Sequence, residues 1–457
     1  NSVHGFKKEN KGSAKRCQKP SKKCGIQSRN NRINALEIIN YNLKHNYFFC
    51  KSKTFIIFSI GILLFLVDQT EGFKLHMKQY DYIFTGTGLS ALMTVYKMVL
   101  SNTFQNKRIL LVDQNAKQTN DRTWCFWDQK EILWERSISK KWDSVIFSNP
   151  DFKKYLTLHP YQYNKIQGLD FYNQVLELIT NQKNIDFAQE KVLAIEESES
   201  IVLVKTESQS YSCSQLFNSI YNPSLVANQS KYPLLQQHFI GWFIQVEIPI
   251  FNSEQATFMD FSVAQKRNTR FMYILPTSPT EALLEYTLFS KDLLSKEEYE
   301  TEIENYIQKL GIQNYQIVEK EYGNIPMTCY PFWKHNTQNV INIGTAGGWT
   351  KASTGFTFKN SDQKSTELVS FLETQTDFRK FHKKTKFWWY DLLLLDILDQ
   401  KNETGAVIFS ALFQNGNAPL ILKFLDEKTS FWEDLQVIWK CPKELFINAL
   451  LKRLFRF

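Results

Sequence analysis

A chain of 457 residues with 43% apolar residues can bury a large core and form one large or two to three ordinary domains. The net charge of +9 comes from the N-terminal end, since residues 1–54 carry 13 Lys/Arg and 2 Asp/Glu, whereas the remainder carries 42 basic and 44 acidic residues. The charge therefore gives little support to nucleic-acid binding by the folded part. Seven scattered cysteines without a CxxC or a paired-histidine spacing argue against a zinc site or a disulfide framework, so we expect no metal and a reducing, cytoplasmic compartment.

The first 76 residues do not have the pattern of a folded domain. Residues 1–54 are rich in Lys, Asn and Ser without periodicity, which predicts disorder. The 13 residues of FIIFSIGILLFLV (55–67) are too few for a membrane span, which needs about 20, and the basic stretch before them is too long for a signal peptide. The first methionine is Met77, so we expect residues 1–76 to be an upstream extension and the native protein to start at Met77; a membrane-associating leader is the alternative.

A dinucleotide fingerprint opens the ordered part of the chain. YDYIFTGTGLSAL (80–92) predicts a strand, a turn with Gly86 and Gly88, and a helix over about 89–101. In such a motif the first glycine permits a tight turn, the second lets the backbone approach the pyrophosphate, and the third lets helix and strand pack closely. Ala91 stands at the third position, where its one extra methyl group meets only packing atoms, and we expect it to be tolerated.

The strand that follows supports the same interpretation. KRILLVDQ (107–114) contains Asp113, 25 residues after Gly88, where a carboxylate would accept the ribose hydroxyls and repel a 2′-phosphate. The phosphates of a dinucleotide would lie against the N–H groups and positive dipole of the helix N-terminus. Together these elements favour a dinucleotide site over the alternative, a Rossmann-like scaffold that has lost its ligand.

The rest of the chain alternates between strand-like and helical patterns. Strands are predicted at 186–206, 239–250, 271–276, 282–289 and 339–344, and helices at 295–310, 361–374 and through 381–457. The 67 aromatic residues fit either an ordinary core or a pocket for a large apolar or cationic species.

A second glycine-rich segment, GTAGGWTKASTGFTF (344–358), follows the last of these strands. Gly344, Gly347, Gly348 and Gly355 would let the backbone reach a flavin, which favours FAD over NAD. The alternative is a flexible surface loop, although an apolar strand leads into the segment.

The predicted fold is therefore α/β, with a Rossmann-like FAD-binding domain and an interleaved mixed β-sheet substrate domain, as in flavoproteins of the hydroxylase type. We expect the FAD-binding parts at about 77–150 and 335–375, with the substrate-binding part at about 151–334 between them. The C-terminal part, 376–457, should be helical.

Several segments of the chain occur together in one known family. They are YDYIFTGTGLSAL, ILLVDQ, DRTWCFW, LLQQHFIGW, MDF, FMYILPTSPTEALLEYTLFS, IPMTCYPF, IGTAGGWTKASTGFTF and FLDEKTSFWED. In this order, from about Met77 to the C-terminus, the chain resembles the flavin-dependent lycopene cyclases of the bacterial beta-cyclase type. DRTWCFW and the combination of TEALLEYT with the GTAGG segment are the most specific.

The resemblance implies an enzyme that closes the acyclic ends of lycopene into beta-ionone rings, giving gamma- and then beta-carotene. It also implies FAD, active in its reduced form without net redox change, with NAD(P)H as the electron source. A proton adds to the terminal double bond, the next double bond attacks the cation, and loss of a ring proton sets the new double bond. This chemistry needs an acid, cation stabilisation, a base and a dry pocket.

The resemblance also points to the acid. The family carries an F-L-E-E-T motif, matched here by LLEYT, in which Glu285 is the first acid and Tyr286 replaces the second, leaving a single carboxyl. The apolar neighbours of Glu285 would raise its pKa and keep it protonated, as a general acid requires. The alternative is a glutamate that points to solvent from an edge strand, and Glu281 is a second choice for the acid.

Other residues are candidates for supporting roles. Arg122 in DRTW could bind the cofactor and Asp260 in MDF could support the site, or either could belong to a structural ion pair. Ala352 stands where the family has proline, which leaves the geometry of that turn open. Aromatic residues that could stabilise a cation, or simply fill the core, are Trp124, Phe126, Trp127, Trp242 and Phe243.

A fully apolar substrate implies contact with a membrane surface, through peripheral attachment. FINALLKRLFRF (446–457) has apolar and basic groups at helical spacing and could lie on a membrane or pack on the core. Two alternatives to a cyclase are an FAD-dependent monooxygenase or reductase of an isoprenoid or aromatic substrate, and a non-catalytic nucleotide-binding scaffold.

Overall fold

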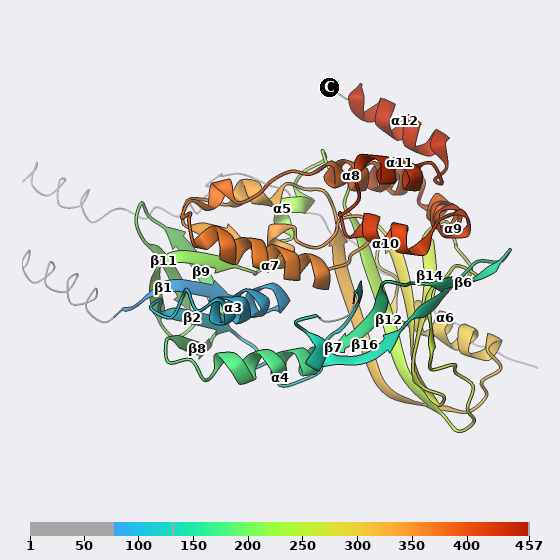
Figure 1. Cartoon of the computed structure of the whole chain (residues 1–457), viewed down its shortest axis with the longest axis horizontal. Coiled ribbons are helices and arrows are strands. Elements are labelled where there is room, and N and C mark those ends of the chain that lie inside the picture. Colours follow the sequence, from blue (N-terminus) through green and yellow to red (C-terminus); the bar gives the residue numbers. More distant parts are fainter. Residues whose placement is uncertain (1–76, 130–131, 456–457) are drawn as a thin grey trace, which may run out of the picture. The chain divides into compact units, whose positions relative to one another are not determined.

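Figure 1 shows the computed structural model of the chain, which describes residues 77–129 and 132–455. The expectations for residues 1–76 fall outside the described residues. Contacts along the chain group His76–Phe457 into one unit, which contains three β-sheets and the helices that cover them.

The first sheet carries the dinucleotide fingerprint. Its order is β8-β2-β1-β11-β10-β9, with β17 beside β11, and all pairs are parallel except β11·β10 and β10·β9. The apolar run Tyr82–Phe84 is buried, as a central parallel strand covered on both faces requires. The strands of this sheet are β1 (Lys78–Thr85), β2 (Ile109–Asp113), β8 (Ile185–Gln189), β9 (Val192–Glu197), β10 (Val202–Thr206), β11 (Ser210–Asn218) and β17 (Val340–Asn342).

Three helices share one apolar core with this sheet. They are α3 (Leu89–Ser101), α4 (Gly168–Ile179) and α7 (Phe358–Leu372). Leu92 of α3, Phe171 of α4 and Phe358 of α7 meet in this core, and α3 contacts both other helices. The short helix α5 (Ser224–Ala227) follows β11. Since α7 starts at the end of the second glycine-rich segment, this packing brings the two glycine-rich segments together.

The second sheet is antiparallel apart from the β5·β13 pair. Its order is β16-β12-β15-β14-β13-β5-β6. Side chains alternate between its two faces, so neighbouring residues such as Glu285 and Tyr286 point to opposite sides. The strands are β5 (Ser144–Ser148), β6 (Lys153–Thr157), β12 (Leu235–Val246), β13 (Gln255–Asp260), β14 (Thr269–Ser278), β15 (Glu281–Ser290) and β16 (Tyr315–Met327).

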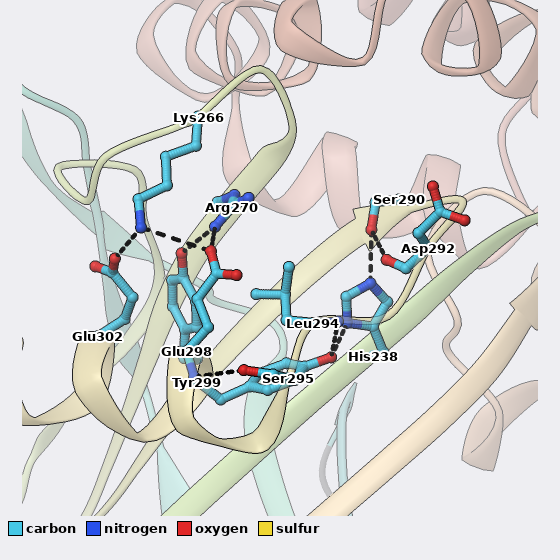
Figure 2. Close-up of polar contacts among 11 residues, drawn as sticks. His238, Lys266, Arg270, Ser290, Asp292, Leu294, Ser295, Glu298, Tyr299 and Glu302 are labelled. Atoms are coloured by element: carbon cyan, nitrogen blue, oxygen red, sulfur yellow. Dashed lines mark hydrogen bonds and ion pairs between the residues drawn. The ribbon is translucent and has the colours of Figure 1, made fainter. Parts of the chain in front are cut away.

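Helix α6 (Lys296–Lys309) covers one face of this second sheet and is held there by a polar network (Figure 2). His238 lies between two hydroxyl groups, with Nε2 2.6 Å from Ser290 Oγ and Nδ1 2.5 Å from Tyr299 OH. Arg270 donates to Glu298 of the helix at 3.0 Å. Burial lowers the pKa of His238 to about 4, so the imidazole is neutral near pH 7.

A three-stranded antiparallel sheet completes the β-structure. It consists of β3 (Thr123–Asp128), β4 (Ile138–Trp142) and β7 (Gln162–Gln167), in the order β3-β7-β4. The two large sheets take their strands from residue ranges that differ from the expected FAD-binding and substrate-binding parts. The run 186–206 forms parts of three strands of the first sheet, because turns interrupt it, whereas β5 already belongs to the second sheet.

The C-terminal part is helical, as predicted. Its helices are α8 (Lys386–Gln400), α9 (Gly405–Asn415), α10 (Ala418–Leu425), α11 (Phe431–Ile438) and α12 (Lys443–Leu454). Leu395, Phe409 and Ile421 from three of them pack on the face of the second sheet that lies opposite α6. Within 77–129 and 132–455, no helix combines the length and apolar character that crossing a bilayer requires.

Candidate active site

A cavity of about 850 Å³ connects the two glycine-rich segments with the face of the second sheet that points away from α6. The predicted site residues that line it are Gly88, Arg122, Glu285, Gly344 and Gly355. The predicted residues that do not contribute to its wall are Gly86, Ala91, Asp113, Gly347 and Gly348. The structure therefore brings both halves of the prediction, dinucleotide segments and acid, to one cavity.

The fingerprint turn has the geometry of a phosphate cradle. Gly86 has a φ of +79°, and a Cβ there would lie 2.5 Å from Ser219 Oγ, so the position requires glycine. Gly88 caps the N-terminus of α3, and no atom lies within 4 Å of where its Cβ would be. Ala91 is fully buried in the core around α3, which makes it a packing position. The open helix N-terminus can hold the diphosphate of a dinucleotide.

Asp113 holds this turn in place. Its carboxylate accepts hydrogen bonds from the Thr87 N–H at 2.6 Å, the Thr87 hydroxyl at 2.9 Å and the Asn115 N–H at 2.8 Å, and Lys117 Nζ lies 3.4 Å away. Burial alone would raise the pKa of Asp113, but these N–H groups and Lys117 lower it, so the group is ionised. Asn115 and Lys117, rather than Asp113, line the cavity.

The second glycine-rich segment forms a buried turn and is not a surface loop. Gly355 has a φ of +72°, and a Cβ there would lie 1.7 Å from Gln237 Oε1. The Gly355 N–H donates to the Lys351 carbonyl at 2.9 Å, so the turn closes with Ala352 inside it. Lys351 Nζ lies 3.2 Å from an Asp391 oxygen, which ties the turn to α8.

The other predicted supporting residues separate into two groups. Trp124 and the exposed Arg122 line the cavity. Trp242 instead packs on the α6 face and Asp260 accepts a hydrogen bond from Tyr306 of α6 at 2.5 Å, so neither reaches the cavity. Phe126, Trp127 and Phe243 also lie outside its wall, whereas aromatic residues that the sequence did not single out contribute to it. These are Tyr163, Tyr172, Tyr221, Phe239, Tyr273, Tyr322, Phe356 and Phe358.

Glu285 lies on β15, next to β12, and faces the cavity. Thr287 donates to Glu285 Oε1 at 2.6 Å. Glu281 is exposed, so the structure favours Glu285 over this second choice. Tyr286 points to the opposite face, where its hydroxyl oxygen accepts from Arg270 at 3.2 Å. The position of the second acid of the motif is therefore not in the cavity.

A second carboxyl is nevertheless present, contrary to the prediction of a single one. Gly241 of β12 pairs with Glu285 on one side and with Glu321 of β16 on the other. A Cβ at Gly241 would lie 3.1 Å from Glu321 Cγ, so the missing side chain leaves room for Glu321. Thr123 donates to Glu321 Oε2 at 2.7 Å.

The protonation of Glu285 follows from its surroundings. Burial raises its pKa well above the usual range, and the neighbouring Glu321 carboxyl raises it further, against the bond from Thr287. Tyr273 and Cys125 nearby are neutral, because burial raises the pKa of both. Glu285 is therefore a protonated acid that faces a cavity.

The sequence contained a signal for Glu321. β16 alternates between half-buried and exposed residues, and Ile317, Glu319 and Glu321 all fall on the half-buried side. An isolated glycine inside a strand, such as Gly241, often marks a close approach of other atoms. Neither signal names the partner, because the pairing of β12 with both β15 and β16 is a tertiary property.

The architecture is the predicted one, the fold of the hydroxylase-type flavoproteins. The fold is similar to a geranylgeranyl bacteriochlorophyll reductase-like protein from Thermoplasma acidophilum (TM-score 0.53, 12% identity, 82% of this chain and 100% of the other). It is also similar to a flavoprotein/dehydrogenase from Cytophaga hutchinsonii (TM-score 0.55, 9% identity, 82% of this chain and 99% of the other). A third similar structure is that of the halogenase PltM in complex with phloroglucinol and FAD (TM-score 0.52, 10% identity, 83% of this chain and 87% of the other).

The chain belongs to the lycopene cyclase family. It matches the family described as "Lycopene cyclase protein" over residues 81–451, which covers most of the chain. No curated protein matches the sequence significantly. Family and fold together indicate an enzyme, and they confirm the predicted family and architecture.

Proposed function

We propose that this protein is a lycopene beta-cyclase, which converts the acyclic ends of lycopene into beta-ionone rings by way of gamma-carotene to beta-carotene. One observation carries the proposal. Glu285 is a carboxyl kept protonated by burial, and it faces a cavity with many aromatic side chains that continues to a dinucleotide cradle. Family membership supports the same reaction.

The cavity also fits the proposed cofactor, FAD. Two polar atoms in its wall, Gln237 Oε1 and Thr354 Oγ1, are buried without a hydrogen-bond partner among the described residues. Such atoms are destabilising unless a ligand or water pairs with them. The turn at Gly86–Ser90 and the segment 344–358 would hold the dinucleotide. Reduced FAD, with NAD(P)H as electron source, would supply negative charge that stabilises a cation.

The protein side of the reaction uses residues of the cavity wall. Glu285 donates its proton to the terminal double bond of the substrate, since its raised pKa keeps the carboxyl protonated near pH 7. The ring faces of Tyr273 and Trp124 can lie against the cationic intermediate. The aromatic and aliphatic wall keeps water away from the cation until the ring proton leaves.

A second candidate is an FAD-dependent monooxygenase or reductase of an isoprenoid or aromatic substrate. The similarity of the fold to a reductase-like protein and to halogenases supports it. The two candidates differ in redox balance, because a cyclase consumes no NADPH in proportion to product. Purified protein with FAD, lycopene in liposomes and NADPH would therefore separate them by the ratio of NADPH oxidised to product formed.

The main test is expression of residues 77–457 and of the full chain in a host that accumulates lycopene. We expect the colour to change from red to orange-yellow and beta-carotene to appear in extracts. Red cells that contain folded, flavin-binding protein would contradict the cyclase proposal. Purified protein without flavin absorbance after added FAD would contradict both candidates.

We further propose that the enzyme attaches peripherally to the cytoplasmic face of a lipid bilayer, where its apolar substrate dissolves. The C-terminal helices leave apolar side chains exposed at helical spacing: Phe431, Trp432, Leu435 and Trp439 at α11, and Ile447, Leu450, Leu451 and Leu454 at α12. Lys440 and Lys443 stand between them, and Lys443 Nζ lies 3.5 Å from the Trp439 ring centre. Apolar faces flanked by lysines match an anionic membrane surface. The other side of α12 packs on α8 through Ala449.

Vesicle flotation tests this attachment. Wild-type protein should float with vesicles of phosphatidylglycerol and phosphatidylcholine, and less with phosphatidylcholine alone. The double variant Trp432→Ser/Trp439→Ser should lose most of this binding, since these side chains are 72% and 69% exposed. Leu193→Ser, another exposed apolar residue, is the matched control. Equal flotation of the double variant and the control would exclude this surface.

A further inference from the structure

We infer that Glu321 is the proton-accepting partner of Glu285, so that one proton shared by two carboxyls begins and ends each ring closure. The inference rests on the proposed cyclase function for its substrate, and on the geometry of the two carboxyls for its residues. It assigns the base that the reaction needs.

The backbone register places the two carboxyls side by side. β12 is the strand between β15 and β16, and Gly241 is the residue opposite both Glu285 and Glu321. The three residues point to the same face, because directly paired residues in a sheet do so. A Cβ at Gly241 would lie 3.1 Å from Cγ and 3.4 Å from Oε1 of Glu321. Glu321 therefore lies over the glycine, on the way to Glu285.

Each carboxyl has its own hydroxyl donor, and the two carboxyls shift the pKa of each other. Thr287 donates to Glu285 from the same strand, and Thr123 donates to Glu321 from the three-stranded sheet. These bonds orient the two groups independently. Glu321 raises the pKa of Glu285, whereas Glu285 lowers that of Glu321, which makes Glu285 the donor.

The charged and titratable groups around the pair favour Glu321 over Glu285 as the ionised member. Burial raises the pKa of both carboxyls, but only for Glu321 does a cation, the buried Lys165 of β7, act together with Thr123 against this shift, while Glu319 of the same strand adds to it. The groups on the other strands, Cys125, Tyr163 and Tyr273, are neutral because burial raises the pKa of each. Lys165 therefore lowers the pKa of Glu321, and no cation has a comparable effect on the pKa of Glu285 among the described residues.

The proton balance closes without any co-reactant. The O–H bond of Glu285 breaks as a C–H bond forms at the terminal double bond, and both carboxyls are then ionised beside the cation. The ring C–C bond forms next. A ring C–H bond then breaks as an O–H bond forms on Glu321, and this proton returns to the neighbouring Glu285 carboxylate. Substrate and product are isomers, and the pair regains its single proton.

The pH profile of kcat in Glu321→Gln tests the assignment, measured on FAD-loaded enzyme with lycopene in liposomes. We expect a loss of about 100-fold or more, as for other general bases. The acid limb, which reports protonation of Glu321, should disappear. The alkaline limb should move to lower pH, because the charge that raises the pKa of Glu285 is gone. A purely structural role would lower the rate and leave both limbs in place.

Glu319→Gln is the matched control, since Glu319 lies two residues away on the same side of β16 and bonds to Asn120 at 3.2 Å. Its plateau rate should stay within about threefold of wild type, a loss too small for a transition-state contact. A Glu321→Gln enzyme that matches this control in rate and keeps both limbs would overturn the inference.

A spectroscopic measurement keeps the inference testable even if lycopene is not the substrate. Infrared difference spectra across a pH titration should show a protonated-carboxyl signal near pH 7 in wild type that is absent in Glu285→Gln. In Glu321→Gln this signal should titrate at lower pH than in wild type. An unchanged titration would overturn the pairing, whereas a changed titration without cyclisation would count only against the proposed function.

Discussion

The two faces of the second sheet both bury titratable groups, but they treat them differently. On the α6 face, His238 has a hydroxyl partner at each ring nitrogen and Arg270 is bound to Glu298 (Figure 2). On the cavity face, Glu285 and Glu321 have no cation within hydrogen-bonding distance among the described residues and are open to a space of about 850 Å³. The groups on the α6 face, each with a hydrogen-bond or ion-pair partner, hold the helix in place. Two buried carboxyls that share one proton destabilise the folded state instead, and they are suited to catalysis.

The largest expected effect is on the cavity face. Glu285→Gln should lower kcat by about 100- to 10,000-fold, the usual contribution of a general acid. The folded-state pKa of Glu285 lies above its unfolded value, so wild type loses stability as the pH rises between the two, and the neutral variant does not. At pH 7 the variant should therefore unfold at equal or higher urea concentration. The exposed Glu281→Gln is the control, and full activity of Glu285→Gln would exclude it as the acid.

The α6 face should respond to pH through stability and not through catalysis. The pKa of His238 is about 4 in the folded protein, below its ordinary value of 6.5. Below pH 6.5 the His238 imidazole takes up a proton in the unfolded chain but not in the folded protein. The stability associated with a neutral His238 is therefore present above pH 6.5 and is lost as the pH falls towards 4. Between pH 7 and 5 the free energy of unfolding should drop by about 2 kcal/mol through this group.

His238→Gln serves to isolate that contribution. The free energy of unfolding of wild type and of His238→Gln is measured with urea at pH 7 and at pH 5. The contributions of all other titratable groups are the same in both proteins and cancel when the two pH dependences are subtracted. The variant should show a smaller drop than wild type. Identical drops would mean that His238 does not resist protonation in the folded state.

The contrast between the two faces also explains what the sequence could predict. The fingerprint around Gly86 and the acid Glu285 are local patterns, in which neighbouring residues specify a turn or an apolar environment. The pairing of Glu321 with Glu285, 36 positions earlier in the sequence, depends on the arrangement of strands, which no local pattern encodes. The same limit left the roles of Trp242 and Asp260 open, because their strands were recognisable but the face covered by α6 was not.

Gly241→Ala should weaken the carboxyl pair without removing either member. The new methyl group would lie 2.8 Å from Leu283 Cδ1 and 3.1 Å from Glu321 Cγ, so it must push both side chains. We expect kcat to fall about tenfold with little change in KM, as for loss of an interaction made in the transition state. Stopped assays of beta-ring formation over a range of lycopene concentrations would separate the two constants. A change in KM alone would place the effect on substrate binding.

The smallest effect should come from Tyr286→Phe, although Tyr286 stands where the family motif has a second acid. Its hydroxyl oxygen accepts a hydrogen bond from Arg270 on the α6 face at 3.2 Å, so its removal should cost about 1 kcal/mol of unfolding free energy. In the variant, Arg270 still donates its hydrogen bond to Glu298, and the aromatic ring at position 286 still contacts Tyr299. Because strand alternation puts the hydroxyl on the far side of the sheet from Glu285, kcat should not change. A loss of activity with unchanged stability would mean that residue 286 takes part in catalysis.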